Sequence, residues 1–237
     1  MEAHQRGILT ATTLMANGDG FDHAVELARR NPSLDIGCHI VLVQSRGMPA
    51  TVAELIRALA KREIDPFEEA RTQVRKILAA GIPLSHLDTH KHTHLLPPVL
   101  DAVVRVAREF NIVWVRRPFD FGLSAGVKLR KKAVALGMRL ARPGFARKLE
   151  GLRATDHFTG FQITGALNTL ALTDTLERLP EGLTEFMCHP GRLGHELAAA
   201  RTRLKQSRAD ELAALTSPEA RTVIVRRGIR LVCYRDL

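Results

Sequence analysis

One short segment of this chain concentrates side chains that can bind a metal ion or transfer a proton. Four of its ten histidines and an aspartate lie in the run His86-Leu87-Asp88-Thr89-His90-Lys91-His92-Thr93-His94. In an extended strand alternate side chains share one face, so these histidines and Asp88 would point the same way. Because each buried polar group needs a partner, such a face favours metal coordination or proton transfer over ordinary packing.

Two other histidines lie near the ends of predicted strands, His39 within residues 35–43 and His189 just after residues 182–188. In parallel α/β folds the carboxyl ends of the strands gather catalytic groups. We therefore predict that His39 and His90 bind a divalent ion, zinc or magnesium, which activates a water for attack on a carbonyl. His189 would donate a proton to the leaving amine.

The roles of the neighbouring side chains are less constrained. Asp88 is predicted to orient a metal ligand, with a turn or capping role as the alternative. His189 has the alternative of a hydrogen-bonded core histidine. His92, His94 and Arg117 are candidates for the substrate pocket.

The surrounding elements alternate between strands and helices, which predicts an α/β fold with a parallel sheet. The expected strands are residues 7–16, 35–43, 85–93, 111–116, 182–188 and 230–234, and the expected helices are 21–30, 51–62, 65–80, 98–110, 167–179, 207–215 and 220–226. Residues 117–161 show no strand rhythm. We interpret the chain as a single domain, 1–237, with an irregular basic insertion at about 117–161.

Composition narrows the class of protein. No run of eighteen apolar residues is present, so no spanning helix is expected. The three cysteines, Cys38, Cys188 and Cys233, are odd in number and far apart, which favours a reducing, cytoplasmic setting. Net charge is +10, and nine Lys or Arg lie between Lys128 and Arg153. That segment is either a solvated face or a contact for an anionic partner, and 5% aromatic content argues against nucleic acid.

Five segments resemble the YdjC-like carbohydrate deacetylases, the ChbG/HpnK group. Residues 7–18 resemble the family's second strand and turn, and residues 36–42 its Gly-x-His-x-x-Leu strand. The histidine run 86–94 resembles its His-Leu-Asp-Ser-His-x-His-x-His signature. Residues 184–191 resemble its Thr-Glu-x-Met-Cys-His-Pro-Gly segment, and residues 227–236 also match.

The resemblance implies a distorted (β/α) barrel of the glycoside hydrolase/deacetylase type that removes N-acetyl groups from amino sugars with a divalent metal, Mg or Zn. By matching position, His39 and His90 would be metal ligands and His189 a proton donor. Residues 156–161 are closer to the hopanoid-associated branch. That likeness implies a lipid-linked amino sugar and peripheral membrane contact through Lys128–Arg153, whereas a small-molecule amino sugar is the other expected substrate. The oligomeric state is open, a homodimer included.

The chain departs from the family pattern at its start. Family members open with a strand ending in Ala-Asp-Asp-Phe-Gly, whose aspartates supply a metal ligand and a base. Residues 1–6 correspond to the helix after that motif. With the first strand missing, we expect weak metal binding, little turnover and an open strand edge.

Two other readings stay open at this stage. One is a different metal-dependent hydrolase, a phosphoesterase or an amidohydrolase, although no further Asp or Lys ligand is evident at a later strand end. The other is a non-catalytic barrel that binds a glycan or a membrane surface through the basic segment.

Overall fold

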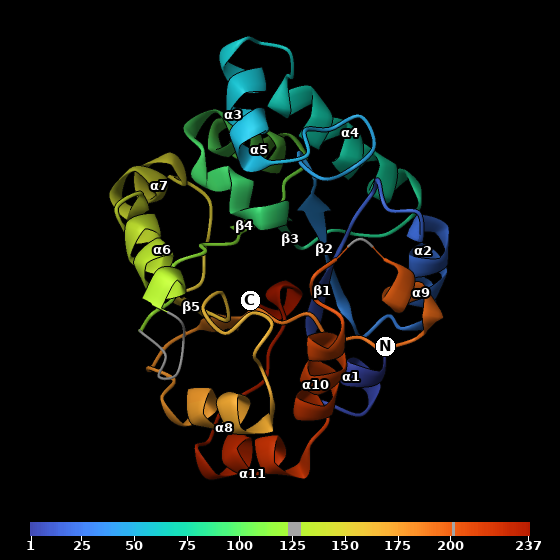
Figure 1. Cartoon of the computed structure of the whole chain (residues 1–237), viewed down its shortest axis with the longest axis vertical. Helices are drawn as coiled ribbons and strands as arrows, with labels where there is room; N and C mark the ends of the chain where they lie inside the picture. The colour runs from blue at the N-terminus through green and yellow to red at the C-terminus, as the bar shows by residue number, and fades with distance from the viewer. Residues whose placement is uncertain (123–128, 201) are drawn as a thin grey trace. The chain divides into compact units, whose positions relative to one another are not determined.

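The computed structural model describes residues 1–122, 129–200 and 202–237, which form two compact units (Figure 1). The four-strand unit comprises Ala11–Arg116, Leu140–Ala154 and Cys233–Leu237. The two-strand unit comprises Met1–Thr10, Arg117–Arg139 and Thr155–Val232. The prediction of a single domain stays a prediction.

A parallel sheet organises the four-strand unit. It consists of β1 (Ala11–Leu14), β2 (Asp35–Ile40), β3 (His86–Thr89) and β4 (Trp114–Val115), in the order β1-β2-β3-β4. The register pairs His39 with Asp88, near the carboxyl ends of β2 and β3. The predicted α/β fold with parallel strands is therefore confirmed, whereas closure into a barrel stays a prediction.

Helices follow the strands of this unit, and their ends carry the expected signals. They are α2 (Phe21–Arg30), α3 (Val52–Ala60), α4 (Pro66–Ala79), α5 (Pro97–Glu109) and α7 (Arg142–Lys148). Asp65 caps α4 by accepting the N–H groups of Phe67 and Glu68, and Pro66 occupies the first turn. α4 packs against α5 and β2 (Figure 1).

The buried side-chain amide of Gln73 on α4 holds the backbone of Val41, the residue that follows β2. Gln73 is 1% exposed, and its Oε1 accepts the N–H of Val41 while its Nε2 donates to the Val41 carbonyl. Val41, Leu42 and Val43 are fully buried. Because this side chain satisfies the peptide groups that a further strand would pair, the chain just after His39 is fixed in place.

The two-strand unit has its own sheet and core. β5 (His157–Thr159) pairs in parallel with β6 (Thr184–Phe186). Its helices are α1 (Glu2–Gln5), α6 (Leu129–Arg139), α8 (Thr169–Glu177), α9 (His195–Ala199), α10 (Gln206–Leu215) and α11 (Pro218–Arg226). α8 packs against α10 and α11 around a core that includes Leu167, Leu172 and Leu215.

The histidine run is not one long strand, which corrects the prediction for residues 85–93. β3 ends at Thr89, and a 3₁₀ segment, η1 (His90–Leu95), follows. Lys91 and His92 have φ values of 54° and 52°, so the alternation of faces stops there. His86 and Asp88 keep the spacing of a strand, whereas His90, His92 and His94 are placed by the turn.

The predicted strand 230–234 is also wrong. This segment is irregular and leads into η2 (Tyr234–Asp236). Arg235 explains the difference, because its guanidinium donates to the Asp35 carboxylate and to the carbonyls of Pro32 and Leu34. These hydrogen bonds hold the C-terminal segment, residues 233–237, beside the start of β2.

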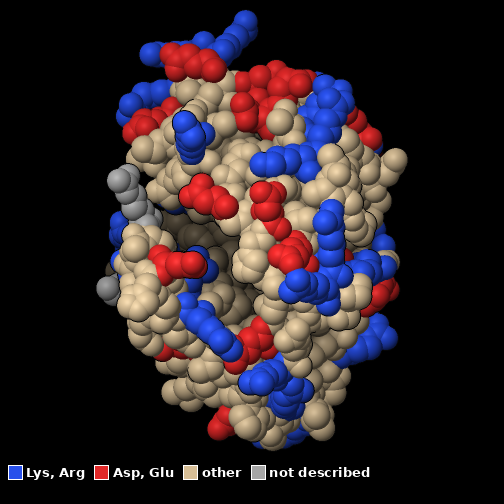
Figure 2. All heavy atoms as spheres, turned by 90° about the vertical axis from the view of Figure 1, so that its right-hand side faces the viewer, with Lys and Arg blue, Asp and Glu red and all other residues tan. Residues whose placement is uncertain are grey.

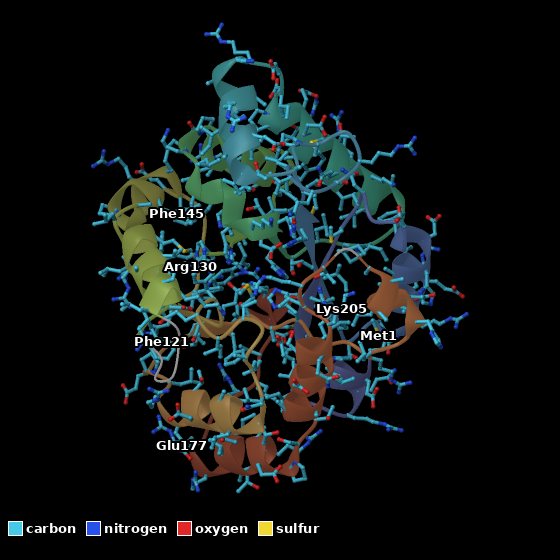
Figure 3. The ribbon with its side chains drawn as sticks, in the orientation of Figure 1. Met1, Phe121, Arg130, Phe145, Glu177 and Lys205 are labelled. Atoms are coloured by element: carbon cyan, nitrogen blue, oxygen red, sulfur yellow. The ribbon has the colours of Figure 1, made fainter. Side chains whose placement is uncertain are left out.

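The segment 117–161 contains regular structure, contrary to the irregular insertion expected. α6, α7 and β5 all lie within it, and Figure 3 labels Arg130 on α6 and Phe145 on α7. Lys128, the first residue of the predicted basic surface, lies outside the described residues. Alanine, leucine, lysine and arginine dominate residues 129–142, and these residue types favour helix even where the apolar pattern is weak.

Cys38, Cys188 and Cys233 all lie in the described part of the chain, and none of them forms a disulfide. Among the described residues, no helix combines the length and apolar character needed to cross a bilayer. On the face that Figure 2 presents, Lys and Arg side chains are interspersed with Asp and Glu.

Candidate functional site

Two imidazoles meet at the carboxyl edge of the four-stranded sheet. His39 lies on β2 and His90 directly follows β3. His39 Nε2 and His90 Nδ1 are 3.3 Å apart, and the two rings meet edge to face with centroids 5.5 Å apart. The structure thus brings together the two residues predicted to bind a metal.

The other nitrogen of each ring already has a partner in the same unit. His39 Nδ1 lies 2.7 Å from Asp88 Oδ1, so a neutral His39 donates there and keeps its lone pair on Nε2. His90 Nε2 lies 3.4 Å from Gln44 Oε1, and donation there leaves the lone pair of His90 on Nδ1. In this tautomer pair two lone pairs face each other, an arrangement that a cation between them stabilises. Without a metal, a proton on His90 Nδ1 fills the same place.

The Asp88 carboxylate holds the His39 ring in this orientation. Its side chain is fully buried; Oδ1 accepts from His39, and Oδ2 accepts a short hydrogen bond from Arg116. Burial alone raises the pKa of Asp88, but Arg116 and His39 outweigh it and hold that pKa well below its usual range. This is the contact that the predicted orienting role requires, although the role itself stays a prediction.

The spacing of the two nitrogens suits a shared ion. Two imidazole ligands about 2.05 Å from a tetrahedral Zn²⁺ lie about 3.3 Å apart. Burial and the charges of His39 and Lys91 lower the pKa of His90 to about 4, so this ring is neutral near pH 7, as a ligand must be. Within the described part of the chain, no cluster of three or more His, Cys, Asp or Glu side chains is arranged to hold a metal. His39 and His90 could supply two ligands to an ion, and their role as metal ligands stays a prediction.

The remaining histidines of the run are enclosed by protein. His94 is fully buried; its Nδ1 lies 2.6 Å from Thr89 Oγ1 and its Nε2 lies 3.0 Å from the Arg116 carbonyl. Burial lowers the pKa of His94 to about 4 and that of buried His92 well below its usual value. Both are placed to brace the turn after β3, and their assignment to a substrate pocket stays a prediction.

His86 lies at the start of β3 and has a packing role. Its ring stacks on Tyr234 with centroids 4.0 Å apart, and burial lowers its pKa to about 4. A Cβ added at Gly37 would lie 2.6 Å from this ring. The glycine before Cys38-His39 therefore allows β2 and His86 to approach closely.

His189 lies in the two-strand unit, in the loop after β6. Its backbone N–H donates to Glu211 Oε2, and its Nδ1 lies 3.9 Å from the same oxygen. The His189 side chain is 30% exposed, whereas that of Glu211 is 1% exposed. Because His189 and the imidazole pair belong to different units, their predicted meeting at one active site stays a prediction. Half-buried Arg117 is the first residue of its segment of the two-strand unit.

Three side chains that contact the candidate site residues were not predicted from the sequence, and two of them left a signal there. Glu211 lies on the stripe of α10 that also buries Ala214 and Leu215, where a carboxylate is unusual. Arg116 ends an apolar strand pattern and so faces a buried environment. Gln44 left no signal, because its contact with His90 depends on a backbone φ of 59° in a loop.

Comparisons with known proteins place the chain in a family. The sequence profile of the YdjC-like proteins matches residues 1–226. A carbohydrate deacetylase of Brevibacillus brevis is 30% identical over 250 aligned positions, which cover 100% of this chain and 92% of the relative. A crystal structure from Enterococcus faecalis V583, provisionally described as a cellobiose-phosphate cleavage protein, superimposes with a TM-score of 0.76 at 23% identity. It covers 99% of this chain and 90% of that one, and at this identity the match shows the fold alone. The chain belongs to the YdjC-like protein family.

Proposed function

We propose that this chain is a carbohydrate deacetylase that hydrolyses N-acetyl groups of amino sugars and uses a divalent ion, Mg²⁺ or Zn²⁺, held by His39 and His90. The observation that carries the proposal is the 3.3 Å separation of His39 Nε2 and His90 Nδ1. The other nitrogen of each ring lies beside Asp88 or Gln44, respectively. The similarity to a carbohydrate deacetylase at 30% identity supplies the reaction class.

The roles proposed for the side chains follow from their chemistry. When bound, a divalent ion supplies Lewis-acid chemistry and polarises the acetamido carbonyl. His39 and His90 hold it, and Asp88 fixes the tautomer of His39. His189 is the proposed proton donor to the amine that leaves. A cytoplasmic location stays a prediction.

An acetate-release assay tests the proposal. The substrates are N-acetylglucosamine oligosaccharides, with the chain as purified, after EDTA treatment, and after re-addition of Mg²⁺ or Zn²⁺. We expect release that EDTA abolishes, that the metal restores, and that His90→Ala lowers at least about 100-fold. The matched control is His23→Ala, because His23 is exposed on α2. Release that is indifferent to both EDTA and His90→Ala would refute the proposal.

The same assay separates the two alternatives. Hydrolysis of a phosphate ester without acetate release would favour a phosphoesterase. Glycan binding without any hydrolysis would favour a non-catalytic barrel.

Reduced turnover is part of the proposal. The sequence contains no Asp-Asp pair, and the described residues offer no third ligand beside His39 and His90. We expect a weakly held ion and slow acetate release, because carboxylates favour hard divalent ions. Full acetate release without an excess of added metal would contradict this.

A lipid-linked amino sugar is the more specific substrate proposed. α6 exposes Leu129 and Leu136, at 81% and 57%, and carries Arg130 and Lys132 (Figure 3 labels Arg130). Lys131 Nζ instead donates to the carbonyls of Gln162 and Thr164. Such a helix suits an anionic lipid surface, where each basic residue adds about 1 kcal/mol. We expect sedimentation with vesicles containing phosphatidylglycerol to exceed that with phosphatidylcholine alone and to weaken with salt. Sedimentation that is independent of both would contradict this contact.

A further inference from the structure

We infer that Glu211 is a positioning residue for His189: its buried carboxylate fixes the imidazole with Nδ1–H toward Glu211 and Nε2–H available for transfer. The inference rests on the proposed function, since it concerns the residue proposed as proton donor. It assigns a task to a carboxylate that sequence reasoning did not single out.

The contact itself is unusual for a buried glutamate. Glu211 lies on α10 with its side chain 1% exposed, and its Oε2 accepts the backbone N–H of His189. The same oxygen is 3.9 Å from His189 Nδ1, and the N–H of Gly165 also interacts with this carboxylate. A hydrogen bond from Nδ1 to the carboxylate requires this separation to shorten to about 3.2 Å. The imidazole is 30% exposed, so it borders solvent as well as the carboxylate.

Residues on one face of α10 hydrogen-bond to the backbone of the loop that contains His189. Arg208 Nη1 donates to the His189 carbonyl at 3.3 Å, and the N–H of Gly191 donates to the Arg208 carbonyl at 2.9 Å. Arg208 and Glu211 are three residues apart and so share a face of the helix. The peptide of His189 is thereby fixed, and Glu211 is the group on that face that can also direct the ring.

The charges around Glu211 favour the protonated form of a neighbouring His189. Burial raises the pKa of Glu211, whereas the N–H groups of His189 and Gly165 and the charge of Arg208 lower it, and the charge of Asp210 raises it. A carboxylate in this setting gains from an adjacent imidazolium, and the imidazolium gains equally. His189 would therefore hold its proton to a higher pH than it would without Glu211, as a general acid needs.

The proton balance is simple. In the imidazolium form Nδ1–H faces Glu211 and Nε2 carries the second proton. As the C–N bond of the substrate breaks, its electron pair stays on the amine nitrogen, which takes the Nε2 proton. His189 is left neutral with Nδ1–H still directed at Glu211, and Glu211 itself gains and loses no proton.

A titration that does not depend on activity tests this first. The Cε1–H signal of His189 is followed by NMR against pH in the full chain, assigned with His189→Gln. We expect Glu211→Gln to lower the pKa of His189 by about one unit, since the amide still accepts the backbone N–H but carries no charge. The matched control is Glu219→Gln, an exposed carboxylate on α11 that should leave this pKa unchanged. A His189 pKa that is the same in Glu211→Gln and wild type would overturn the inference.

The pH profile of acetate release gives a second readout. A general acid must be protonated, so kcat/KM falls as pH rises through its pKa, and Glu211→Gln should move this fall to lower pH by about one unit. A uniform drop at every pH, with the fall unmoved, would mean that Glu211 only supports the loop and would overturn the inference. If the NMR shift occurs in a chain that releases no acetate, the deacetylase proposal fails while the assignment of Glu211 holds.

Discussion

The two units hold their histidines by different means. In the four-strand unit, His39 and His90 come from neighbouring parallel strands, and Asp88 and Arg116 form an ion pair in which the aspartate is fully buried. In the two-strand unit, His189 follows a three-residue strand, and α10 holds its main chain more firmly than its ring. The first arrangement brings two ring nitrogens together, whereas the second holds a peptide and places a buried carboxylate 3.9 Å from the ring.

This difference matches two kinds of chemistry. An ion is shared only when its ligands are held to within a few tenths of an ångström, which a paired strand register provides. A proton donor must instead reach a group whose position changes during the reaction. The two arrangements suit the roles proposed for them: a cation between His39 and His90, and a proton donor at His189 whose ring Glu211 directs.

The largest expected effect is acid sensitivity of the four-strand unit. His86 and His94 have pKa values of about 4 in the folded chain, because burial disfavours their charged forms. In the unfolded chain these histidines have a pKa near 6.5, so below that pH the unfolded state binds more protons than the folded state. The free energy of unfolding is therefore highest above pH 6.5 and falls as pH drops toward 4. We expect a loss of about 2 kcal/mol per histidine between pH 6.5 and 5.

Urea unfolding at pH 7, 6 and 5, followed by the fluorescence of buried Trp114 on β4, measures this loss. Asp88 contributes in a lower window, because its depressed pKa keeps it charged until well below pH 4. His23→Ala, at an exposed site, should leave the pH dependence unchanged. Stability that is flat between pH 6.5 and 5 would contradict the buried, neutral state of these rings.

Removal of the Asp88 carboxylate should have the next largest effect. Asp88→Ala removes the carboxylate that accepts from Arg116, whose side chain is 10% exposed, and breaks the hydrogen bond to His39. We expect the free energy of unfolding to fall by about 3–5 kcal/mol. The control is Asp101→Ala, which removes an exposed pair with Lys148 and should cost under about 1 kcal/mol. Equal losses from the two variants would show that the buried Asp88–Arg116 pair contributes no more stability than the exposed Asp101–Lys148 pair.

The smallest effect should come from Glu211→Gln. Its amide oxygen still accepts the His189 N–H, so we expect the free energy of unfolding to change by about 1 kcal/mol or less. Glu211→Ala leaves that N–H without its acceptor and should cost about 1–3 kcal/mol. Thermal unfolding of both variants measures the difference, and an equal loss would mean that the backbone contact contributes little.

Much of the four-strand unit could be predicted from the sequence because its signals are local. The Asp65-Pro66 start of α4 and the apolar run of β2 follow from capping and burial, and the structure confirms both. The contact between His39 and His90 followed from the rule that strand ends gather side chains. Residues 90–94 could not be placed, because the turn depends on two positive φ values that alternation does not reveal.

The two-strand unit was harder to predict for a physical reason. Its partners are distant in sequence, and their contacts join helix to loop rather than strand to strand. Glu211 and His189 are 22 residues apart and meet through a backbone N–H, a group that carries no sequence information. One segment of the four-strand unit was hard to predict for the same reason: the residues after Val232 are held by Arg235 binding to Asp35, 200 residues away.

Calorimetric titration with Zn²⁺ near pH 7.5 tests whether His39 and His90 share a cation. We expect one ion per chain, at least about tenfold weaker binding in both His39→Ala and His90→Ala, and unchanged binding in His23→Ala. Wild-type affinity retained in either of the first two variants would contradict this expectation.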